Sequence, residues 1–342
     1  MLSTSSASPP PLPLLLTGIA GVAGYNAFHY FQRKYPGQVF AVRRKDNWPL
    51  RGEGIIPLDL DDRDGLKRVF DRHQFAAVLN CEGTCKLKSC ELDPAMAARI
   101  NIDSVLSLLE QTAGTAVRFV HLSIDLVYSG TRGGGHVEED ETDPVTIYGK
   151  TMAQAERILL RERPDACILR ISLPMGISFN GHAGAIDWIQ SRFKKQKPAT
   201  LYFDEIRTPT YTDCLNPLLA RLLASNLSGL YHAGGTRRLS LYEIAQVVNR
   251  VGGYDASCLI GCPRIEAGPI PPRAGDVTMD SGKLARALGY QPFDPWPLLD
   301  AHVPTHAEWH RERPAGEVGS PEYLAEVLYR NPRRARRTAG AL

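Results

Sequence analysis

The chain alternates between short apolar runs and longer amphipathic stretches. The apolar runs have the length of strands, and the stretches between them carry apolar residues at helical spacing, as Leu66, Val69 and Phe70 do. This alternation predicts parallel strands joined by crossover helices, an α/β fold. We expect strands at residues 14–16, 38–42, 55–60, 76–80, 117–122 and 167–171, and helices at residues 27–35, 61–73, 94–110 and from 147 onward.

The second half of the chain has a different pattern, with shorter apolar runs and more loops. Ser240 followed by Glu243 predicts a capping box at the start of a helix that runs through residue 251. Beyond Trp296 the chain is polar, and we interpret its arginine-rich end as a solvated charged segment. Other expected features are a loop at 172–180, helices at 184–195 and 213–224, strand-and-turn segments at 201–211 and 229–235, and a short helix ending near 289.

These patterns suggest four regions. We expect a disordered lead-in at 1–13, a sheet domain at 14–171 to which 201–228 contributes, a smaller lobe made mainly of 172–300, and a polar, basic extension at 301–342.

Chemistry-bearing residues gather at the ends of the expected strands. In open parallel sheets, ligands bind beyond the carboxyl ends of the strands. Five such residues in five elements therefore indicate one binding edge, and they are Gly18, Arg43, Asp59, Asn80 and Ser123.

The first of these ends is a glycine turn, in which Gly18, Gly21 and Gly24 follow Thr17. A strand, glycine turn and helix can hold a diphosphate, since glycines allow close backbone approach and the helix start offers unpaired N–H groups. The alternative is an ordinary strand-to-helix loop.

Arg43, Arg44 and Lys45 follow the second strand. Basic residues at that place suit the 2′-phosphate of NADP(H), whereas an acidic residue would bind the ribose of NAD(H). The alternative is a solvated run of charge.

Composition narrows the function classes. The 342 residues carry a net charge of +3, too small to favour nucleic acid as a partner. The longest apolar run is far below the ~20 residues of a membrane span, and no secretory signal pattern is evident, so we expect a cytoplasmic protein with reduced thiols. The seven cysteines include no CxxC pair, so we expect no metal site at Cys81, Cys85 and Cys90.

From residue 14 to about 296 the sequence resembles the extended short-chain dehydrogenase/reductases, and within them the dTDP-4-dehydrorhamnose reductases; the regulatory β subunit of methionine adenosyltransferase has a similar fold. Nine separated motifs carry the resemblance. They are the Thr17-to-Gly24 turn, Asp59-Leu60, Asn80-Cys81, Asp125-Leu126-Val127-Tyr128 with Gly130, Tyr148-Gly149-Lys150-Thr151, Arg207-Thr208-Pro209-Thr210-Tyr211, Gly229-Leu230-Tyr231-His232, Pro272-Arg273, and Asp280 with Lys283-Leu284.

The resemblance implies a Rossmann-type doubly wound parallel sheet with a smaller C-terminal α/β substrate lobe. It implies hydride transfer from NADP(H), more than NAD(H), to a keto carbon of a 4-keto nucleotide-sugar, and it allows a homodimer or a regulatory partner. The implied cofactor contacts are Gly18, Gly21, Val22, Ala23, Gly24, Arg43, Asp59, Leu60, Asn80, Cys81 and Tyr148, and the implied substrate contacts are Arg207, Tyr211, His232 and Arg273.

The catalytic residues depart from the family pattern. Tyr148 matches the family acid, but Met152 stands at the lysine position and Ile124 at the Ser/Thr position. Lys150 lies about 200° around the helix from Tyr148, and Ser123 should face the other side of its strand from Ile124, so neither is an obvious substitute. Two of three catalytic positions are thus apolar.

Glu82 is a further departure, because relatives carry a small residue there. A carboxylate directed at a diphosphate would repel it, whereas one directed at solvent would not.

Three interpretations follow. The chain is a nucleotide-sugar reductase or epimerase with an altered site, or a catalytically silent cofactor-binding protein that acts as a sensor or regulatory subunit, or a protein that keeps only the fold. Cofactor binding without turnover separates the first two.

Overall fold

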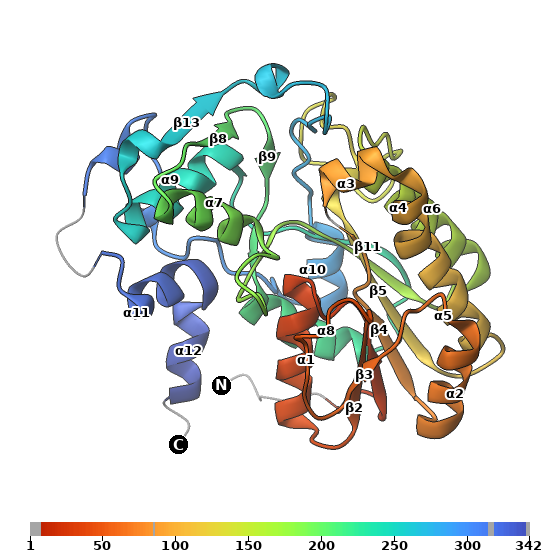
Figure 1. Ribbon diagram of the computed structural model, residues 1–342. Coiled ribbons are helices and arrows are strands. Elements are labelled where there is room, and N and C mark those ends of the chain that lie inside the picture. Colours follow the sequence, from red (N-terminus) through yellow and green to blue (C-terminus); the bar gives the residue numbers. More distant parts are fainter. Residues whose placement is uncertain (1–7, 85, 314–317, 340–342) are drawn as a thin grey trace.

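Seven parallel strands form the centre of the molecule in the computed structural model, which describes residues 8–84, 86–313 and 318–339 (Figure 1). Their order across the sheet is β11-β6-β5-β4-β1-β2-β3. The chain returns to the sheet with β11 after building part of a second lobe. The strands are β1 (Leu14–Leu16), β2 (Val39–Arg43), β3 (Ile55–Pro57), β4 (Ala77–Asn80), β5 (Arg118–Ile124), β6 (Cys167–Ile171) and β11 (Gly229–Ala233).

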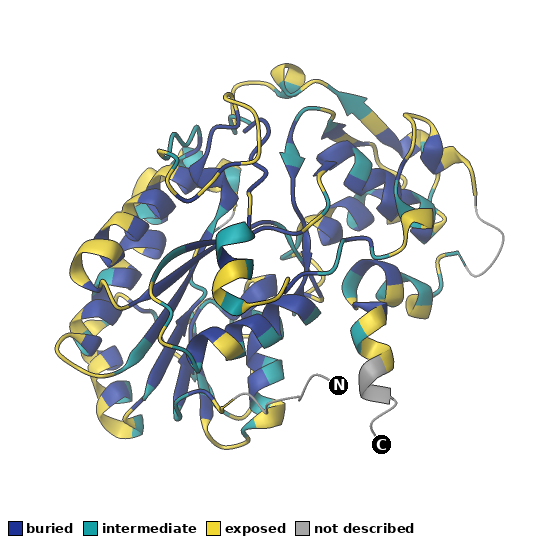
Figure 2. Cartoon of the chain, turned by 180° about the vertical axis from the view of Figure 1, so that it is seen from behind, coloured by how far each residue is buried: buried dark blue, intermediate teal, exposed yellow. Residues whose placement is uncertain are grey.

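Helices cover both faces of this sheet because its strands are apolar on both sides. Leu14 and Leu16 face the core beneath one helical layer, and Leu15 faces the core beneath the other, as the two-residue period of a strand requires. The first layer contains α1 (Val22–Lys34) and α8 (Thr212–Leu223), and the second contains α2 (Arg63–His73), α5 (Ser104–Thr112) and α6 (Ile147–Glu162). Figure 2 shows the buried strands between these layers. The predicted α/β fold with a doubly wound parallel sheet is confirmed.

The smaller lobe is built on three two-stranded sheets. It lies beside the main sheet, with β8, β13, α7 and α9 grouped together (Figure 1). Its helices are α7 (Ala185–Lys194) and α9 (Leu241–Gly252), and its strand pairs are β7 (Pro174–Met175) with β10 (Thr210–Tyr211), β9 (Ile206–Arg207) with β12 (Leu239–Ser240), and β8 (Ala199–Tyr202) with β13 (Leu259–Cys262). The later helix α10 (Gly282–Leu288) packs against β11 of the main sheet. The predicted capping box of Ser240 and Glu243 is confirmed at the start of α9.

Several element boundaries differ from the sequence expectation. The first helix begins at Val22 instead of residue 27, because the turn ends at Gly21. The helix expected at 94–110 is α4 (Pro94–Ala98) and α5 joined by a π-helical turn at Arg99–Asp103, and α3 (Leu87–Leu92) precedes it. The loop expected at 172–180 contains β7, and the third strand ends at Pro57 instead of residue 60.

Both ends of the described chain pack against the core. Pro10 is buried, and the Pro13 carbonyl accepts a 2.9 Å hydrogen bond from the Ala76 N–H, so residues 10–13 do not belong to a disordered lead-in; residues 1–7 lie outside the described part.

At the other end, α11 (Pro321–Leu324), a π turn at Ala325–Tyr329 and α12 (Pro332–Ala339) follow one another. Val327 and Leu328 are buried there, and Arg333 pairs with Asp294 at 2.8 Å. The expected solvated arginines are exposed at Arg330, Arg333 and Arg336, but the segment that carries them is anchored to the core.

Candidate functional site

The glycine turn joins β1 to α1 at the carboxyl edge of the sheet. Gly18 has a φ of +66°, and a Cβ added to it would lie 2.0 Å from the Cys81 carbonyl oxygen. A Cβ on Gly24 would lie 2.4 Å from the Gly18 carbonyl oxygen, whereas one on Gly21 would meet nothing closer than 3.5 Å. Gly18 and Gly24 are therefore required by packing within the protein, and the exposed Gly21 adds no side chain at the N-cap of α1.

The start of α1 is suited to an anion. No described side chain caps it, and its first turn holds no acidic residue. The N–H groups of the first turn, which include those of Val22, Ala23 and Gly24, have no partner within a helix and carry the positive end of its dipole.

Asn80 braces the turn from the end of β4. Its buried Oδ1 accepts hydrogen bonds from Thr17 Oγ1 at 2.6 Å and from the Glu82 N–H at 3.1 Å. Its Nδ2 lies 2.9 Å from Nδ1 of His121, whose pKa burial lowers to about 4, so the ring is neutral. Asn80 thus shapes the turn from beneath, and Cys81 does so through its carbonyl oxygen.

Glu82 directs its carboxylate toward the turn. The half-buried carboxylate accepts a hydrogen bond from the Gly18 N–H, and Arg44 is the nearby cation. Desolvation is the main reason why its pKa is raised to about 7. The sequence left the direction of this side chain open, and the structure places it at the turn.

Arg43 is held by its own loop. Its Nε donates to the Leu50 carbonyl oxygen at 2.8 Å, and its Nη1 donates to the carbonyl oxygens of Arg44 at 2.9 Å and Lys45 at 3.1 Å. Asp59 accepts a hydrogen bond from the Lys45 N–H at 3.1 Å, and Leu60 is buried. Arg44, from the same basic run, is the cation near the turn, and it pairs with Asp46 at 3.4 Å.

Tyr148, Met152 and Ile124 come together in one apolar cluster between α6 and the end of β5. Tyr148 and Met152 are buried members of this cluster, and the partly buried Ile124 packs against it. A Cβ on Gly83, just beyond β4, would lie 3.6 Å from Met152 Sδ and 4.0 Å from the Tyr148 hydroxyl. Both side chains therefore end at the same point on the binding edge.

Neither suggested substitute reaches this point. The Ser123 hydroxyl donates to Glu156, and Lys150 is exposed on α6. Asn101, from the π turn, lies nearby instead: its Oδ1 accepts the Thr84 N–H at 2.9 Å and its Nδ2 donates to Thr151 Oγ1 at 2.8 Å. Sequence reasoning missed Asn101, because the interruption of its helix has no local signal.

Two of the four expected substrate contacts are engaged inside the protein. The Tyr211 hydroxyl donates to the Val327 carbonyl oxygen at 3.0 Å, and His232 Nε2 lies 3.0 Å from the Tyr128 hydroxyl. Burial and the charge of Arg170 lower the pKa of His232 to about 3, which keeps its ring neutral.

The other two expected contacts share a carboxylate. Arg207 donates to Asp125 Oδ1 at 2.5 Å and to Glu205 Oε1 at 3.2 Å. Arg273 donates to Glu205 Oε2 at 2.7 Å and lies 4.8 Å above the Tyr202 ring. Of the four expected contacts, Arg273 has the most accessible side chain, with 17% exposed.

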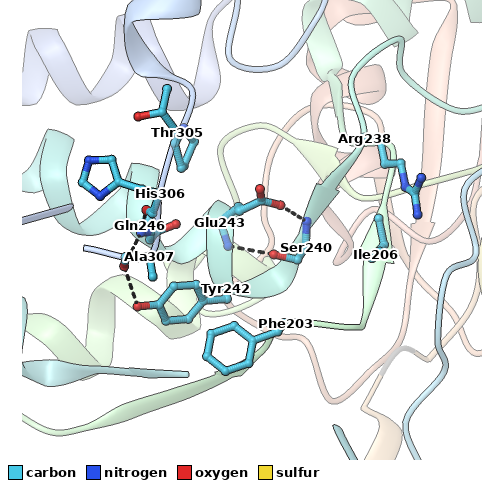
Figure 3. Close-up of a pocket in the computed structure, with 11 residues that line it drawn as sticks. Phe203, Ile206, Arg238, Ser240, Tyr242, Glu243, Gln246, Thr305, His306 and Ala307 are labelled. Atoms are coloured by element: carbon cyan, nitrogen blue, oxygen red, sulfur yellow. Dashed lines mark hydrogen bonds between the residues drawn. The ribbon is translucent and has the colours of Figure 1, made fainter. Parts of the chain in front are cut away.

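A pocket of about 490 Å³ lies in the smaller lobe beside α9 (Figure 3). None of the predicted site residues lines it. Its carboxylate, Glu243, accepts the Ser240 N–H at 2.6 Å in the capping box, and Tyr242 donates to the Ala307 carbonyl oxygen at 3.0 Å. Its polar groups thus mainly stabilise α9 and the segment that crosses it.

The described residues contain no cluster of three or more His, Cys, Asp or Glu that could hold a metal ion; Cys85 lies outside them. Within the same residues, no helix has both the length and the apolar character needed to cross a bilayer.

Comparison with known proteins gives a family match over most of the chain. The model of a family described as the RmlD substrate binding domain matches residues 12–298. The dTDP-4-keto-6-deoxy-D-glucose reductase of Streptomyces niveus is 26% identical over 301 residues, covering 84% of this chain and 97% of the relative. The methionine adenosyltransferase 2 subunit beta of Danio rerio is 22% identical over 284 residues, covering 79% and 83%.

Solved structures show the same fold. The dTDP-4-dehydrorhamnose reductase of Bacillus anthracis, in complex with NADP, superposes with a TM-score of 0.71 at 19% identity, covering 83% of this chain and 95% of that one. The UDP-glucose 4-epimerase of Thermus thermophilus, in complex with NAD, gives a TM-score of 0.68 at 22% identity, covering 82% and 93%.

Proposed function

Since the chain belongs to the RmlD substrate binding domain family, we propose that it binds an NAD(P) dinucleotide at the glycine turn and acts as a regulatory or sensor protein without efficient turnover. One observation carries the proposal. Ile124 and Met152 pack in one apolar cluster with Tyr148, where the family reaction needs a hydroxyl and an ammonium.

The chemical reason is the loss of two polar groups at the reacting carbonyl. Without a neighbouring cation, Tyr148 is a weaker proton donor, and general acid catalysis typically contributes ~10²–10⁴-fold. Without a hydroxyl at position 124, the carbonyl oxygen loses a hydrogen-bond donor, which by analogy with an oxyanion hole costs ~10²–10³-fold. Position and orientation of the reactants can survive both losses, so slow turnover remains compatible with the site.

The dinucleotide fits the turn better than it fits the catalytic end. The start of α1, which no described side chain caps, and the close packing of Gly18 and Gly24 supply a cradle for a diphosphate. The solved relatives carry NADP or NAD. Arg43 is held by its own loop, but Arg44 and Lys45 also follow β2, where basic residues suit a 2′-phosphate. We therefore favour NADP(H) for this chain.

The same proposal assigns the regions of the chain. Residues 14–171, with α8 from the 201–228 segment and β11, form the dinucleotide domain, and the rest of 172–300 mainly forms a ligand lobe for a nucleotide-sugar or similar small molecule. Relatives named methionine adenosyltransferase 2 subunit beta favour a protein partner for a silent member of the family, and a homodimer is the alternative.

A second candidate is a 4-keto nucleotide-sugar reductase of low activity. It is favoured by Tyr148, which keeps the family position and ends at the binding edge. Relatives named as reductases of such sugars support it.

Fluorescence titration of the purified protein with NADPH and NADH separates the two candidates, with cofactor consumption recorded in the presence of a 4-keto nucleotide-sugar. We expect saturable binding, tighter for NADPH, without steady consumption. Steady consumption of the cofactor would assign the reductase function. If the folded protein binds neither cofactor, the chain keeps only the fold of its family.

A further inference from the structure

Glu82 stands where the chain leaves β4 and passes over the glycine turn. Its backbone is fixed there, because its N–H donates to Asn80 Oδ1 and its nitrogen would lie 2.5 Å from a Cβ on Gly18. The side chain therefore starts within contact distance of the turn, on the edge where the strand ends converge.

The carboxylate turns toward Gly18 and accepts its backbone N–H. The charged groups that act on it are Arg44 in the loop after β2, which attracts it, and Asp46 and Asp59, which repel it. The neighbouring Cys81 is a neutral thiol, since burial raises its pKa. The carboxylate is thus an anion in the place where the turn would receive another anion.

We propose that Glu82 is an internal competitor for the dinucleotide, so that the diphosphate binds well only when the carboxylate is neutralised or moves away. This inference rests on the proposed dinucleotide site and adds its regulation. A full negative charge beside a diphosphate repels it.

The competition makes dinucleotide affinity depend on pH. With a pKa near 7, Glu82 is neutral in most molecules at pH 6 and ionised in most molecules at pH 8.5. If only the neutral form binds, the apparent affinity follows the neutral fraction and falls about 30-fold between these two pH values. Proton uptake would accompany binding at neutral pH.

The experiment measures NADH binding by calorimetry at pH 6 and pH 8.5 for the wild-type chain and for Glu82→Gln. NADH is the decisive probe, because the 2′-phosphate of NADPH, like other phosphomonoesters, titrates near pH ~6 itself. The Gln variant keeps an oxygen that can accept the Gly18 N–H, so it should fold. Glu82→Ala is a second variant that removes the group entirely.

Glu53→Gln is the matched control, since it removes an exposed carboxylate from the loop before β3. We expect wild-type and Glu53→Gln affinities to fall about 30-fold with pH. Glu82→Gln and Glu82→Ala should bind with little pH dependence, and at pH 8.5 they should bind at least ~10-fold more tightly than wild type.

Two results would overturn the inference in distinguishable ways. Equal affinity and equal pH dependence in wild type and Glu82→Gln would reject the competitor and leave the proposed function standing. The other result is that neither wild type nor either Glu82 variant binds NADH at either pH, while thermal melts show that all three are folded. That result would reject both the role of Glu82 as a competitor and the proposed dinucleotide site.

Discussion

Gly18 illustrates how strongly a single residue can be constrained in this fold. It needs a left-handed backbone and also an absent side chain, because the Cys81 carbonyl oxygen fills the space where a Cβ would be. Gly37 has a similar φ of +71°, but a Cβ there would meet no atom within 4 Å. A substitution at Gly37 therefore introduces backbone strain alone, whereas one at Gly18 introduces backbone strain and steric overlap.

We predict that Gly18→Ala destabilises the protein far more than Gly37→Ala does. The second change should cost only the strain of a left-handed alanine, about 1–2 kcal/mol. The first adds an overlap with the β4 backbone that only a shift of the turn can relieve. Denaturant unfolding of both variants measures the difference. Equal losses of unfolding free energy would mean that the turn can shift away from Cys81 without cost.

A second residue-scale prediction concerns Ile124 and Met152, the apolar residues at two of the expected catalytic positions. Met152→Lys combined with Ile124→Thr should raise reductase activity on a 4-keto nucleotide-sugar by at least ~10²-fold, because it restores a cation beside Tyr148 and a donor for the carbonyl oxygen. Initial rates of NADPH consumption measure the gain.

The exposed Lys150 supplies the control, since Lys150→Met should leave those rates unchanged. A folded double variant that binds cofactor but gains nothing would contradict the roles given to positions 124 and 152.

At the scale of elements, a buried ion pair joins α6 to the sheet. Arg170 on β6 donates to Glu156 on α6 at 2.6 and 2.9 Å, and Ser123 on β5 donates to the same carboxylate. Arg170 Nη1 also donates to the Tyr128 hydroxyl at 2.5 Å. This network fixes the helix that carries Tyr148 and keeps the Ser123 hydroxyl engaged with Glu156.

Arg170→Met should lower the free energy of unfolding by about 3–5 kcal/mol, because Glu156 would stay buried without its cation. Adding Glu156→Gln should recover part of that loss, so the two changes should not be additive. Lys67→Met, which breaks an exposed pair with Asp71, should cost about 0.5 kcal/mol or less. Additive losses in a urea-unfolding cycle would argue that the two charges act independently.

The elements also show which parts of the molecule a sequence can predict. Strands β1, β2 and β4 and the glycine turn follow from local periodicity and local glycines, so their places were predicted to within a residue or two. The break at Arg99–Asp103 was not, because Asn101 is held by Thr84 and Thr151, whose proximity arises only in the fold.

Roles of single polar residues were harder still. Tyr211 and His232 sit in motifs that suggest a ligand, but their partners Val327 and Tyr128 come from distant parts of the chain. The same holds for Glu82, whose direction depends on the turn that follows β1.

At the scale of the whole molecule, the C-terminal segment closes over residues of the smaller lobe and of α8. The indole N–H of the buried Trp296 donates to the Leu328 carbonyl oxygen at 3.1 Å, and Asn331 Nδ2 donates to Asp294 at 2.8 Å. The family match ends at residue 298, and residues after it thus form part of the core instead of extending from it.

A chain of alternating charges links the sheet domain to the smaller lobe. Asp125 follows β5, Glu205 and Arg207 lie at β9, and Arg273 precedes α10. Arg207 is 4% exposed and pairs with both carboxylates, so it holds two negative charges that would otherwise be buried without a partner. Its position favours a structural role over the substrate contact that its motif suggests.

Arg207→Met should therefore lower the free energy of unfolding by about 3–5 kcal/mol, as expected when one partner of a buried ion pair is removed. Arg273→Met should cost less, because Glu205 keeps Arg207 and the Arg273 side chain is partly exposed. Urea unfolding of both variants, followed by binding of a nucleotide-sugar, separates the two roles. If Arg207→Met keeps its stability but loses sugar binding, Arg207 is a substrate contact. If its stability falls and the folded fraction still binds the sugar, Arg207 is a structural link between the two lobes.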